Sequence, residues 1–341
     1  MLKVGIVGAG FMGSMHANVY ANLSQAHVTA VADLDTKKAG ALNVPQSATV
    51  FPSIEALLEK SDVDLVDICL PTYLHAENVV KAAQAGKHIM CEKPMALSLD
   101  EADSMIQTAD RADVGFFVGH CIRFWPEYQV LKEFFDKETL GRLTSLACTR
   151  LSPTPTWSWD NWLLEPHRSK SATLDLHIHD TDYILYLLGK PVSVFSRGKH
   201  DEKGWVHIFT NFKYPSNIAV TALGGWDFPP NFPFNMAFLA VFARGAMQMD
   251  LGKTPSFVVY EQGVEKPYTP PLPKPEIEAV ESGGNISDLG GYFNEIQYYT
   301  NCLLAGEKPT IVTPQTSRDS LETVLAEIES AETGKEVLVS R

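Results

Sequence analysis

The sequence has few cysteines and no pairing pattern among them. Its 341 residues contain five, and no two are spaced as CxxC. Cys69, Cys91 and Cys148 lie in apolar, strand-like runs, a pattern typical of small buried side chains in a reducing compartment. We therefore expect no disulfide framework.

The chain also lacks an excess of basic residues and a long apolar segment. Its formal net charge is −13, without a basic patch interleaved with aromatic residues. This argues against nucleic acid and anionic membranes as partners. No apolar run approaches the about 20 residues that span a bilayer, and the first residues do not resemble a signal peptide. We expect a cytoplasmic protein.

The length exceeds what one compact core usually holds and suits two domains. Hydrophobic residues make up 45% and charged residues 20%, which is ordinary for a globular protein. An apolar strand at residues 3–7 leads into Gly8-Ala9-Gly10-Phe11-Met12-Gly13, followed by a helical pattern at 14–23. A second strand at 28–32 ends at Asp33.

This order of strand, GxGxxG, helix, strand and acid is typical of a Rossmann unit that binds a dinucleotide. Gly8 permits the tight turn, Gly10 lets the backbone approach the pyrophosphate, and Gly13 lets helix and strand pack closely. The helix N-terminus offers N–H groups to the phosphates. Asp33 can bind ribose hydroxyls and would repel a 2′-phosphate, which favours NAD. The nearby lysines 37 and 38 leave NADP possible.

The alternation of strands and helices continues to about residue 120. We expect strands at 64–70, 87–91 and 115–119 and helices at 54–60, 76–85 and 99–111. Such alternation predicts a doubly wound parallel sheet with helices on both faces. Ligands bind such sheets beyond the carboxyl ends of the strands. The glycine turn, Asp33, Pro71, Lys93 and His120 all fall at that edge.

A possible catalytic group lies downstream, where Asp175, His179 and Asp182 fall on one expected helix at 173–188. Oxidation of a carbinol needs a base and a group that stabilises the alkoxide. His179 suits the base, since its ordinary pKa is near neutrality. Asp175 precedes it by four residues and shares its helix face, so it could orient the imidazole or hold a substrate hydroxyl. Lys93 could stabilise the alkoxide or itself act as acid or base, and the sequence leaves this choice open.

We expect no metal site in this region. His177 and His179 are two residues apart and face different sides of a helix, and no further ligand cluster is evident nearby. His177 is better explained as a packed or hydrogen-bonded residue.

The remaining chain predicts an α+β domain. Strands are expected at 143–151, 192–197, 205–213, 217–224, 236–243, 246–251 and 256–261, and helices at 128–137, 292–305 and 316–332. Three tryptophans within residues 157–162 could stack on a sugar or pack against the sheet, and Trp157 and Trp162 are our candidates for the first role. Arg123 could line the substrate cleft or form a structural ion pair.

Several motifs together resemble the Gfo/Idh/MocA oxidoreductase family, essentially from end to end. The most specific is Ala85-Gly86-Lys87-His88 followed by Glu92-Lys93-Pro94. The others are the glycine turn with His16, Pro71-Thr72 with His75, Arg123-Phe124, and Asp175-x-x-x-His179-x-x-Asp182.

The resemblance implies a Rossmann domain at 1–121 and a second domain at 122–341 with a large, open, mostly antiparallel sheet. It leaves open whether the C-terminal helix packs back on the first domain. It also implies a homodimer or homotetramer and NAD(P)-linked chemistry at a carbinol carbon of a sugar or cyclitol. The implied cofactor contacts beyond the glycine turn and Asp33 are Leu70, Pro71, Thr72, His75, Glu92 and Lys93. The implied substrate contacts are Lys93, Arg123, Asp175 and His179, with Trp157 and Trp162 added from the aromatic pattern.

One stretch departs from the family. Many relatives carry glycines where this chain has Lys170-Ser171-Ala172-Thr173-Leu174, and His177 occupies a position that is often glycine. The substrate is therefore less certain than the reaction type.

Three functions remain open. The first is an NAD-dependent dehydrogenase of a sugar, sugar derivative or polyol. The second is an enzyme that retains and recycles NAD, as in epimerisation, glycosidic cleavage or transhydrogenation. The third is a non-catalytic NAD-bound sensor. Release of free NADH separates the first from the others.

Overall fold

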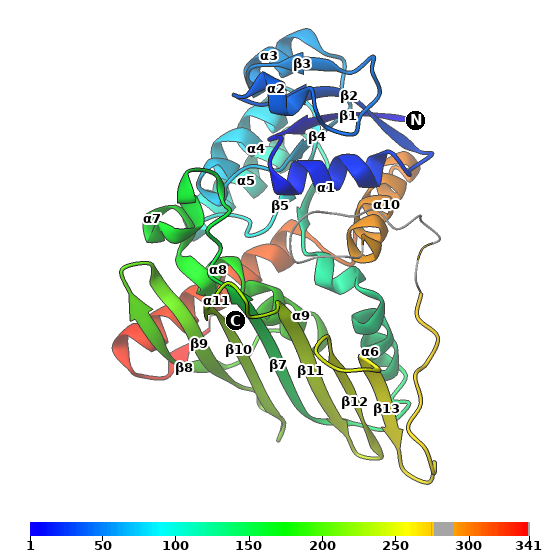
Figure 1. Ribbon diagram of the computed structural model, residues 1–341, viewed down its shortest axis with the longest axis vertical. Helices are drawn as coiled ribbons and strands as arrows, with labels where there is room; N and C mark the ends of the chain where they lie inside the picture. Colours follow the sequence, from blue (N-terminus) through cyan, green and yellow to red (C-terminus); the bar gives the residue numbers. More distant parts are fainter. Residues whose placement is uncertain (274, 276–288, 340–341) are drawn as a thin grey trace. The chain divides into compact units, whose positions relative to one another are not determined.

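The computed structural model describes residues 1–273, 275 and 289–339. The chain forms two compact units (Figure 1). The first comprises Met1–Phe124 and Pro275–Arg318, and the second Trp125–Lys274 and Asp319–Arg341. Within the described residues, the helices are too short or too polar to cross a membrane.

The first unit contains a six-stranded sheet in the order β3-β2-β1-β4-β5-β6. All of its strand pairs are parallel, which confirms the predicted doubly wound sheet. The strands are β1 (Leu2–Val7), β2 (Ala26–Ala32), β3 (Thr49–Phe51), β4 (Leu65–Ile68), β5 (His88–Glu92) and β6 (Phe116–Gly119). The short β3 was not expected, because three residues carry too little pattern to reveal a strand.

The helices of this unit surround the sheet. They are α1 (Phe11–Tyr20), α2 (Thr36–Ala39), α3 (Ile54–Lys60), α4 (His75–Gln84), α5 (Leu99–Arg111) and α10 (Gly290–Ala305), with short 3₁₀ turns η1 (Thr72–Leu74) and η2 (Cys121–Phe124). The chain moves in opposite directions along the sheet from β1 to β2 and from β4 to β5. Right-handed crossovers therefore place α1 and α4 on opposite faces. Helix α10 packs on the sheet through Tyr299, whose ring stacks 4.7 Å from that of Phe117.

Local chemistry explains where several of these helices begin. Ser98 and Glu101 form a reciprocal capping box at the start of α5, and Ser53 caps α3. Such caps satisfy N–H groups that lack a partner within the helix. Helix α1 differs, since Gly10 precedes it without a side-chain cap among the described residues.

The second unit contains an eight-stranded sheet in the order β13-β12-β11-β7-β10-β9-β8-β14. Only β7 and β10 pair in parallel among the described strands of this sheet. This confirms the prediction of a mostly antiparallel sheet. The strands are β7 (Leu143–Pro153), β8 (Ser193–Asp201), β9 (Gly204–Lys213), β10 (Ala219–Phe228), β11 (Asn235–Phe242), β12 (Gly245–Asp250), β13 (Phe257–Glu261) and β14 (Val337–Leu338).

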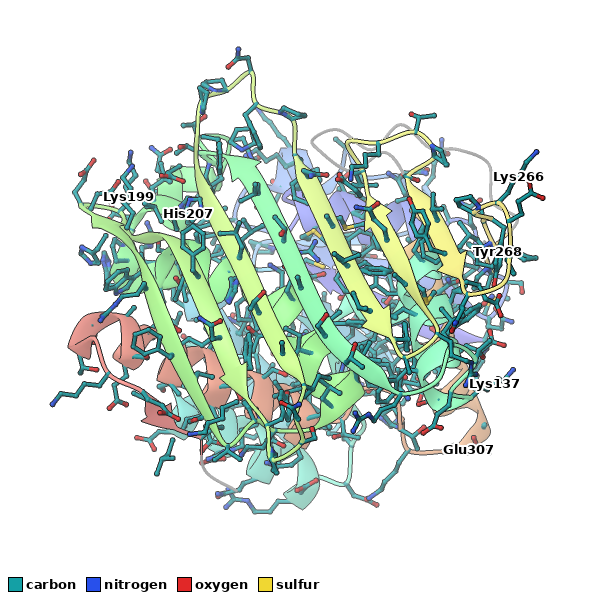
Figure 2. The ribbon with its side chains drawn as sticks, turned by 90° about the horizontal axis from the view of Figure 1, so that it is seen from below. Lys137, Lys199, His207, Lys266, Tyr268 and Glu307 are labelled. Carbon is teal, nitrogen blue, oxygen red and sulfur yellow. The ribbon has the colours of Figure 1, made fainter. Side chains whose placement is uncertain are left out.

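Helices cover one face of this sheet, and the other face is open (Figures 1 and 2). Strand β9 shows the alternation, because Val206, Ile208 and Thr210 are buried while Phe209 and Asn211 are exposed. The helices are α6 (Pro126–Asp136), α7 (Pro166–Ser169), α8 (Ser171–Asp175), α9 (Ile178–Leu188) and α11 (Pro314–Thr333), with the 3₁₀ segment η3 (Trp159–Leu164).

The prediction of one continuous helix at 173–188 is wrong. Helix α8 ends at Asp175 and α9 begins at Ile178. At the junction the N–H of His177 bonds to the carbonyl of Ala172, five residues back. The wider turn breaks the regular helical pattern and changes the expected relation between Asp175 and His179.

Candidate functional site

The glycine turn after β1 has the shape that a dinucleotide needs. Gly8 has φ +101°, and an added Cβ there would lie 2.5 Å from the carbonyl oxygen of Cys69. A Cβ at Gly13 would lie 1.9 Å from the carbonyl oxygen of Gly8. A Cβ at Gly10 would meet none of the described atoms within 4 Å, so the backbone is open to a ligand. With no side-chain cap described on α1, this helix N-terminus fits a pyrophosphate.

Asp33 lies beside the glycine turn. Its Oδ2 accepts the N–H of Ala9 at 2.7 Å, and its Oδ1 accepts the N–H of Asp35 at 2.7 Å. Asp35 in turn caps α2, which carries the two lysines that left NADP possible. The structure therefore brings the predicted ribose-binding carboxylate and the predicted pyrophosphate turn together.

The segment after β4 supplies the next group of predicted cofactor residues. Leu70 and Pro71 are partly buried, and Thr72 is buried. The His75 ring is fully buried, with Nε2 2.8 Å from the Leu70 carbonyl oxygen and Nδ1 2.8 Å from that of Pro94. His75 thus links the turn after β4 to the turn after β5, which is a supporting position for the cofactor site.

Lys93 follows β5 in a run of buried residues. Cys91, Glu92, Pro94 and Met95 are buried, whereas Lys93 is only partly buried. Its main-chain N–H donates to Oε2 of Glu92 at 3.1 Å. Lys93 is therefore the residue of this run that reaches the surface.

In the second unit, the α8–α9 junction carries Asp175 and His179. From Ser171 to Asp182, only Asp175, Leu176 and His179 are not fully buried. Because α8 and α9 are separate helices, the same-face argument from a spacing of four residues does not apply. The two side chains still emerge on either side of one short junction.

Buried ion pairs and hydrogen bonds hold the residues around this junction in place. Arg150 binds Asp180 through two nitrogen–oxygen pairs, at 3.1 and 2.9 Å. Thr181 donates to Oε1 of Glu327 at 2.8 Å. Asp182, which the sequence grouped with the catalytic candidates, is buried and accepts a bond from Ser320 at 2.7 Å. Asp182 therefore lies in the packed interior, where it takes part in a structural hydrogen bond.

Sequence reasoning missed Glu327 of α11. This carboxylate is fully buried, and its Oε2 lies 2.7 Å from Nε2 of His177 and 2.6 Å from Oγ1 of Thr210. The prediction that His177 is a hydrogen-bonded residue is confirmed. A signal was available, because Glu327 follows the buried Val324 by three residues and so lies on the buried face of its helix.

The other predicted substrate residues have different surroundings. Trp162 packs against the cluster of Leu163, Ala172, Val206 and Trp226, whereas Trp157 is 62% exposed. Arg123 is buried and donates to the carbonyl of Ile311 at 2.6 Å. These positions favour the packing role for Trp162 and the structural role for Arg123.

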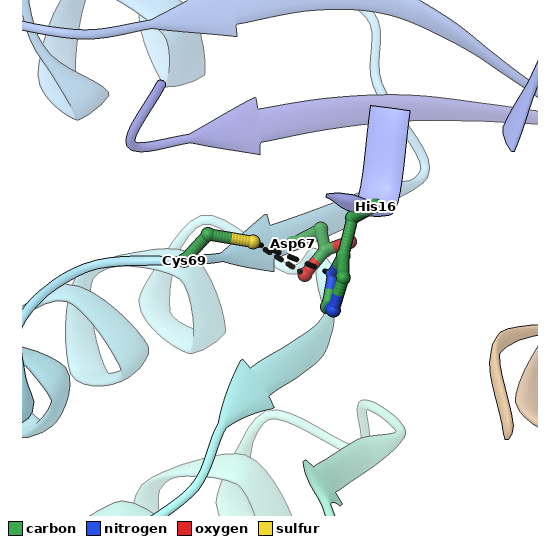
Figure 3. Close-up of side chains that lie close together, drawn as sticks. All are labelled: His16, Asp67 and Cys69. Atoms are coloured by element: carbon green, nitrogen blue, oxygen red, sulfur yellow. Dashed lines mark hydrogen bonds and ion pairs between the residues drawn. The ribbon is translucent and has the colours of Figure 1, made fainter. Parts of the chain in front are cut away.

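One group among the described residues has metal-ligand spacing: His16, Asp67 and Cys69 (Figure 3). Its atoms already pair with one another, since Nδ1 of His16 lies 2.8 Å from Asp67 and 3.4 Å from the Cys69 sulfur. Burial raises the pKa of Cys69 far above its usual value, so its thiol is protonated. These features fit a hydrogen-bonded network better than a metal centre.

Comparison with known proteins agrees with this geometry. Residues 2–120 match the Gfo/Idh/MocA oxidoreductase family, NAD-binding Rossmann fold, and residues 128–246 match the Gfo/Idh/MocA C-terminal domain. The chain belongs to this family. Its first unit is accordingly an NAD-binding Rossmann fold.

The individual members of the Gfo/Idh/MocA family compared below share about a third or less of their aligned residues with this chain. The myo-inositol 2-dehydrogenase of Thermotoga maritima is 32% identical over 200 residues, which span 58% of each chain. The 2,7-anhydro-N-acetylneuraminate hydratase of Escherichia coli is 28% identical over 287 residues, covering 76% of this chain and 73% of that protein. A levoglucosan dehydrogenase solved with NADH and levoglucosan has the same fold, with a TM-score of 0.85, 21% identity and full coverage of both chains.

Proposed function

We propose that this protein is an NAD-dependent dehydrogenase that transfers a hydride between the nicotinamide and a carbinol carbon of a sugar, sugar derivative or cyclitol. The observation that carries the proposal is the grouping at the carboxyl edge of the first sheet. The glycine turn, Asp33, the Leu70–Thr72 segment and Lys93 follow β1, β2, β4 and β5, which are neighbours in that sheet. Membership of the family and the name of the Thermotoga relative support the substrate class.

Lys93 has the properties of a group that acts on the reacting oxygen. Its backbone is held by Glu92, and its side chain is the partly exposed one in a buried run. An ammonium group in such a place stabilises a developing alkoxide. When bound, NAD supplies the hydride acceptor.

His179 and Asp175 are the proposed contributions of the second unit. His179 would take or give the hydroxyl proton, and Asp175 would orient that imidazole or hold a neighbouring hydroxyl. Their support is that both are partly exposed at the α8–α9 junction, whereas the charged residues 180 and 182 are buried in structural pairs.

The test is NADH formation by the purified protein with inositols, aldoses, amino sugars and sugar acids, with NAD and NADP in parallel. NAD-linked turnover of one class would establish the reaction, the cofactor and the substrate family together. Conversion of a sugar without NADH release would indicate an enzyme that recycles its NAD. Tight NAD binding without any conversion would indicate a sensor.

A substitution at Lys93 tests its role. Lys93→Ala should lower kcat roughly 10²–10⁴-fold, the range for loss of a positioned acid–base group. Lys87→Ala is the matched control, because Lys87 immediately precedes β5 at the opposite end of the strand. Near-normal turnover of Lys93→Ala would show that the assignment is wrong.

We also propose that the chain forms a homodimer or homotetramer through the open face of the second sheet. Phe209, Leu239 and Tyr260 are 52%, 42% and 44% exposed, and the strand register places them on the same face. These side chains lie on β9, β11 and β13, and a second copy of the chain packed on this face would cover them. Analytical ultracentrifugation would test the proposal, and a monomer at micromolar concentration would contradict it.

A further inference from the structure

A buried histidine lies between two buried carboxylates in the first unit. His16 comes from α1, Asp67 from β4 and Glu92 from the end of β5. Nδ1 of His16 is 2.8 Å from Oδ2 of Asp67, and Nε2 is 3.0 Å from Oε1 of Glu92. The side chains of His16 and Asp67 are fully buried, and that of Glu92 is 5% exposed. Figure 3 shows the His16 ring against Asp67 and Cys69.

The number of protons in this group follows from its geometry. A neutral imidazole has one N–H and one lone pair, whereas a carboxylate only accepts hydrogen bonds. The contact to Glu92 is an ion-pair distance without hydrogen-bond alignment, since Nε2 of His16 and Oε1 of Glu92 have no hydrogen-bond partner among the described residues. A neutral His16 with its proton on Nδ1 would leave the Nε2 lone pair beside this buried oxygen. A second ring proton removes this repulsion and offsets part of the buried negative charge.

The groups around His16 fit this protonation. Burial by itself lowers the pKa of His16, but the charge of Asp67 and its hydrogen bond to the ring raise it well above its usual value. Burial raises the pKa of both Cys69 and Tyr20, so these neighbours are neutral.

The side of this group formed by α10 and β6 carries one more carboxylate. Helix α10 contributes Tyr292, whose ring is 6.4 Å from that of His16 and whose pKa burial raises well above its usual value. It also contributes Glu295, which is buried. A Cβ added at Gly119 would lie 3.6 Å from Oε1 of Glu295 and 3.4 Å from Oε1 of Glu92. Glu295 is therefore an additional acidic side chain on this side of the group.

The network ends at Lys93. One oxygen of Glu92 faces His16, and the other accepts the main-chain N–H of Lys93 at 3.1 Å. The Glu92 carboxylate thus lies against His16 through Oε1 and accepts the hydrogen bond of the Lys93 backbone through Oε2. Helix α1 begins at Phe11, within the glycine turn, so the same helix carries part of the cofactor turn and the residue that lies against Glu92.

We propose that His16 is a positioning residue: a buried imidazolium, held by Asp67, fixes the Glu92 carboxylate and through it the backbone of Lys93. The kinetic consequence rests on the catalytic role proposed for Lys93. The structural consequence does not, so the two can be tested separately.

The structural test needs no activity. In protein labelled with ¹⁵N-histidine, both His16 ring nitrogens should be protonated at pH 8, with the signals assigned by their loss in His16→Gln. In protein labelled with ¹⁵N-lysine, the Lys93 amide should exchange with solvent at least about tenfold faster in His16→Gln than in the wild type, because its acceptor is no longer held. His88→Gln is the matched control, since His88 is on β5 at the end away from Glu92.

Three results would overturn the structural proposal. They are a neutral His16 ring at pH 8, an unchanged Lys93 exchange rate in a folded His16→Gln protein, and a stoichiometric bound metal that Cys69→Ser removes. If His16→Gln does not fold, Asp67→Asn replaces it. That change retains the side-chain size, and it should both lower the pH at which His16 loses its second proton and speed exchange at Lys93.

The kinetic test is a double-mutant cycle between His16→Gln and Glu92→Gln. His16→Gln should lower kcat about 10- to 100-fold, the effect of a small displacement of a catalytic group. The double variant should lose no more than Glu92→Gln alone, because His16 acts through Glu92. Independent, multiplying effects would refute the positioning role. An inactive wild type would refute the proposed function but leave the exchange and protonation results decisive.

Discussion

Replacing Glu327 by glutamine should destabilise the second unit by about 1.5–3 kcal/mol. The carboxylate is fully buried and accepts three hydrogen bonds. Oε1 accepts from Thr181, and Oε2 accepts from His177 and Thr210. A glutamine of the same size retains one acceptor oxygen and presents an NH₂ group to the remaining donors.

The magnitude follows from which donors can find another partner. The Thr210 hydroxyl can turn to Oγ of Ser196, 2.8 Å away. His177 cannot adapt in this way, because its Nδ1 is buried without a hydrogen-bond partner among the described residues. Moving the proton to Nδ1 would leave a buried N–H unpaired. The net loss is therefore one charge-assisted bond and its unpaired donor, worth about 1.5–3 kcal/mol.

Urea unfolding followed by tryptophan fluorescence would measure this effect selectively. All six tryptophans lie between residues 125 and 226, within the second unit. In a separate thermal melt, the melting temperature should fall by about 3–12 °C, given about 2–4 °C per kcal/mol for a unit of 150–250 residues. Glu329→Gln is the control, since Glu329 is exposed on the same helix. A Glu327→Gln effect below about 0.5 kcal/mol, the usual range for surface changes, would refute the reasoning.

Three further predictions concern the cofactor, the pH dependence and the substrate. Asp33→Ser should lower kcat/KM with NAD about 10- to 100-fold relative to NADP, because the carboxylate that would repel a 2′-phosphate is removed; equal ratios in both proteins would contradict it. Partial burial raises the pKa of Asp227, but hydrogen bonds from His207 and Lys199 outweigh it and lower the pKa below 3.8. A carboxyl group whose pKa is lower in the folded than in the unfolded protein stabilises the fold at a pH above its unfolded pKa, and this stability is lost as the pH falls through its folded pKa. Asp227→Asn should therefore lower the urea midpoint near pH 7 but not well below pH 3.8. Trp157→Ala should raise KM for the sugar at an unchanged urea midpoint, since Trp157 is 62% exposed; a lowered midpoint with normal KM would assign it to packing.

Local patterns predicted most of the first unit. The helix predicted at 99–111 has those bounds because Ser98 and Glu101 form a capping box, a signal contained in four residues. The glycine turn was predicted from its own spacing. The steric limit at Gly13 is local, because a Cβ there would meet the carbonyl of Gly8, whereas a Cβ at Gly8 would meet the carbonyl of Cys69, which is distant in the sequence.

Patterns failed where a long-range contact competes with a local preference. The run from 173 to 188 has good helical character, yet His177 bonds to a residue 150 positions away and the helix breaks beside it. Asp67 gave a clearer signal, as a charged residue inside the apolar strand Leu65–Ile68. A lone buried charge requires a partner, but the sequence does not say that the partner is His16.

The sequence by itself determined the fold class, the NAD-binding turn and the residue types available for chemistry, because these depend on periodicity, on glycine sterics and on short motifs. Only the tertiary structure decided which candidates are buried in structural pairs and which reach the surface. Asp182 is bound to Ser320, whereas Asp175 and Lys93 are partly exposed. The physical reason is that a polar side chain takes its partner from whatever the fold brings within about 3 Å, and that neighbour can be anywhere in the chain.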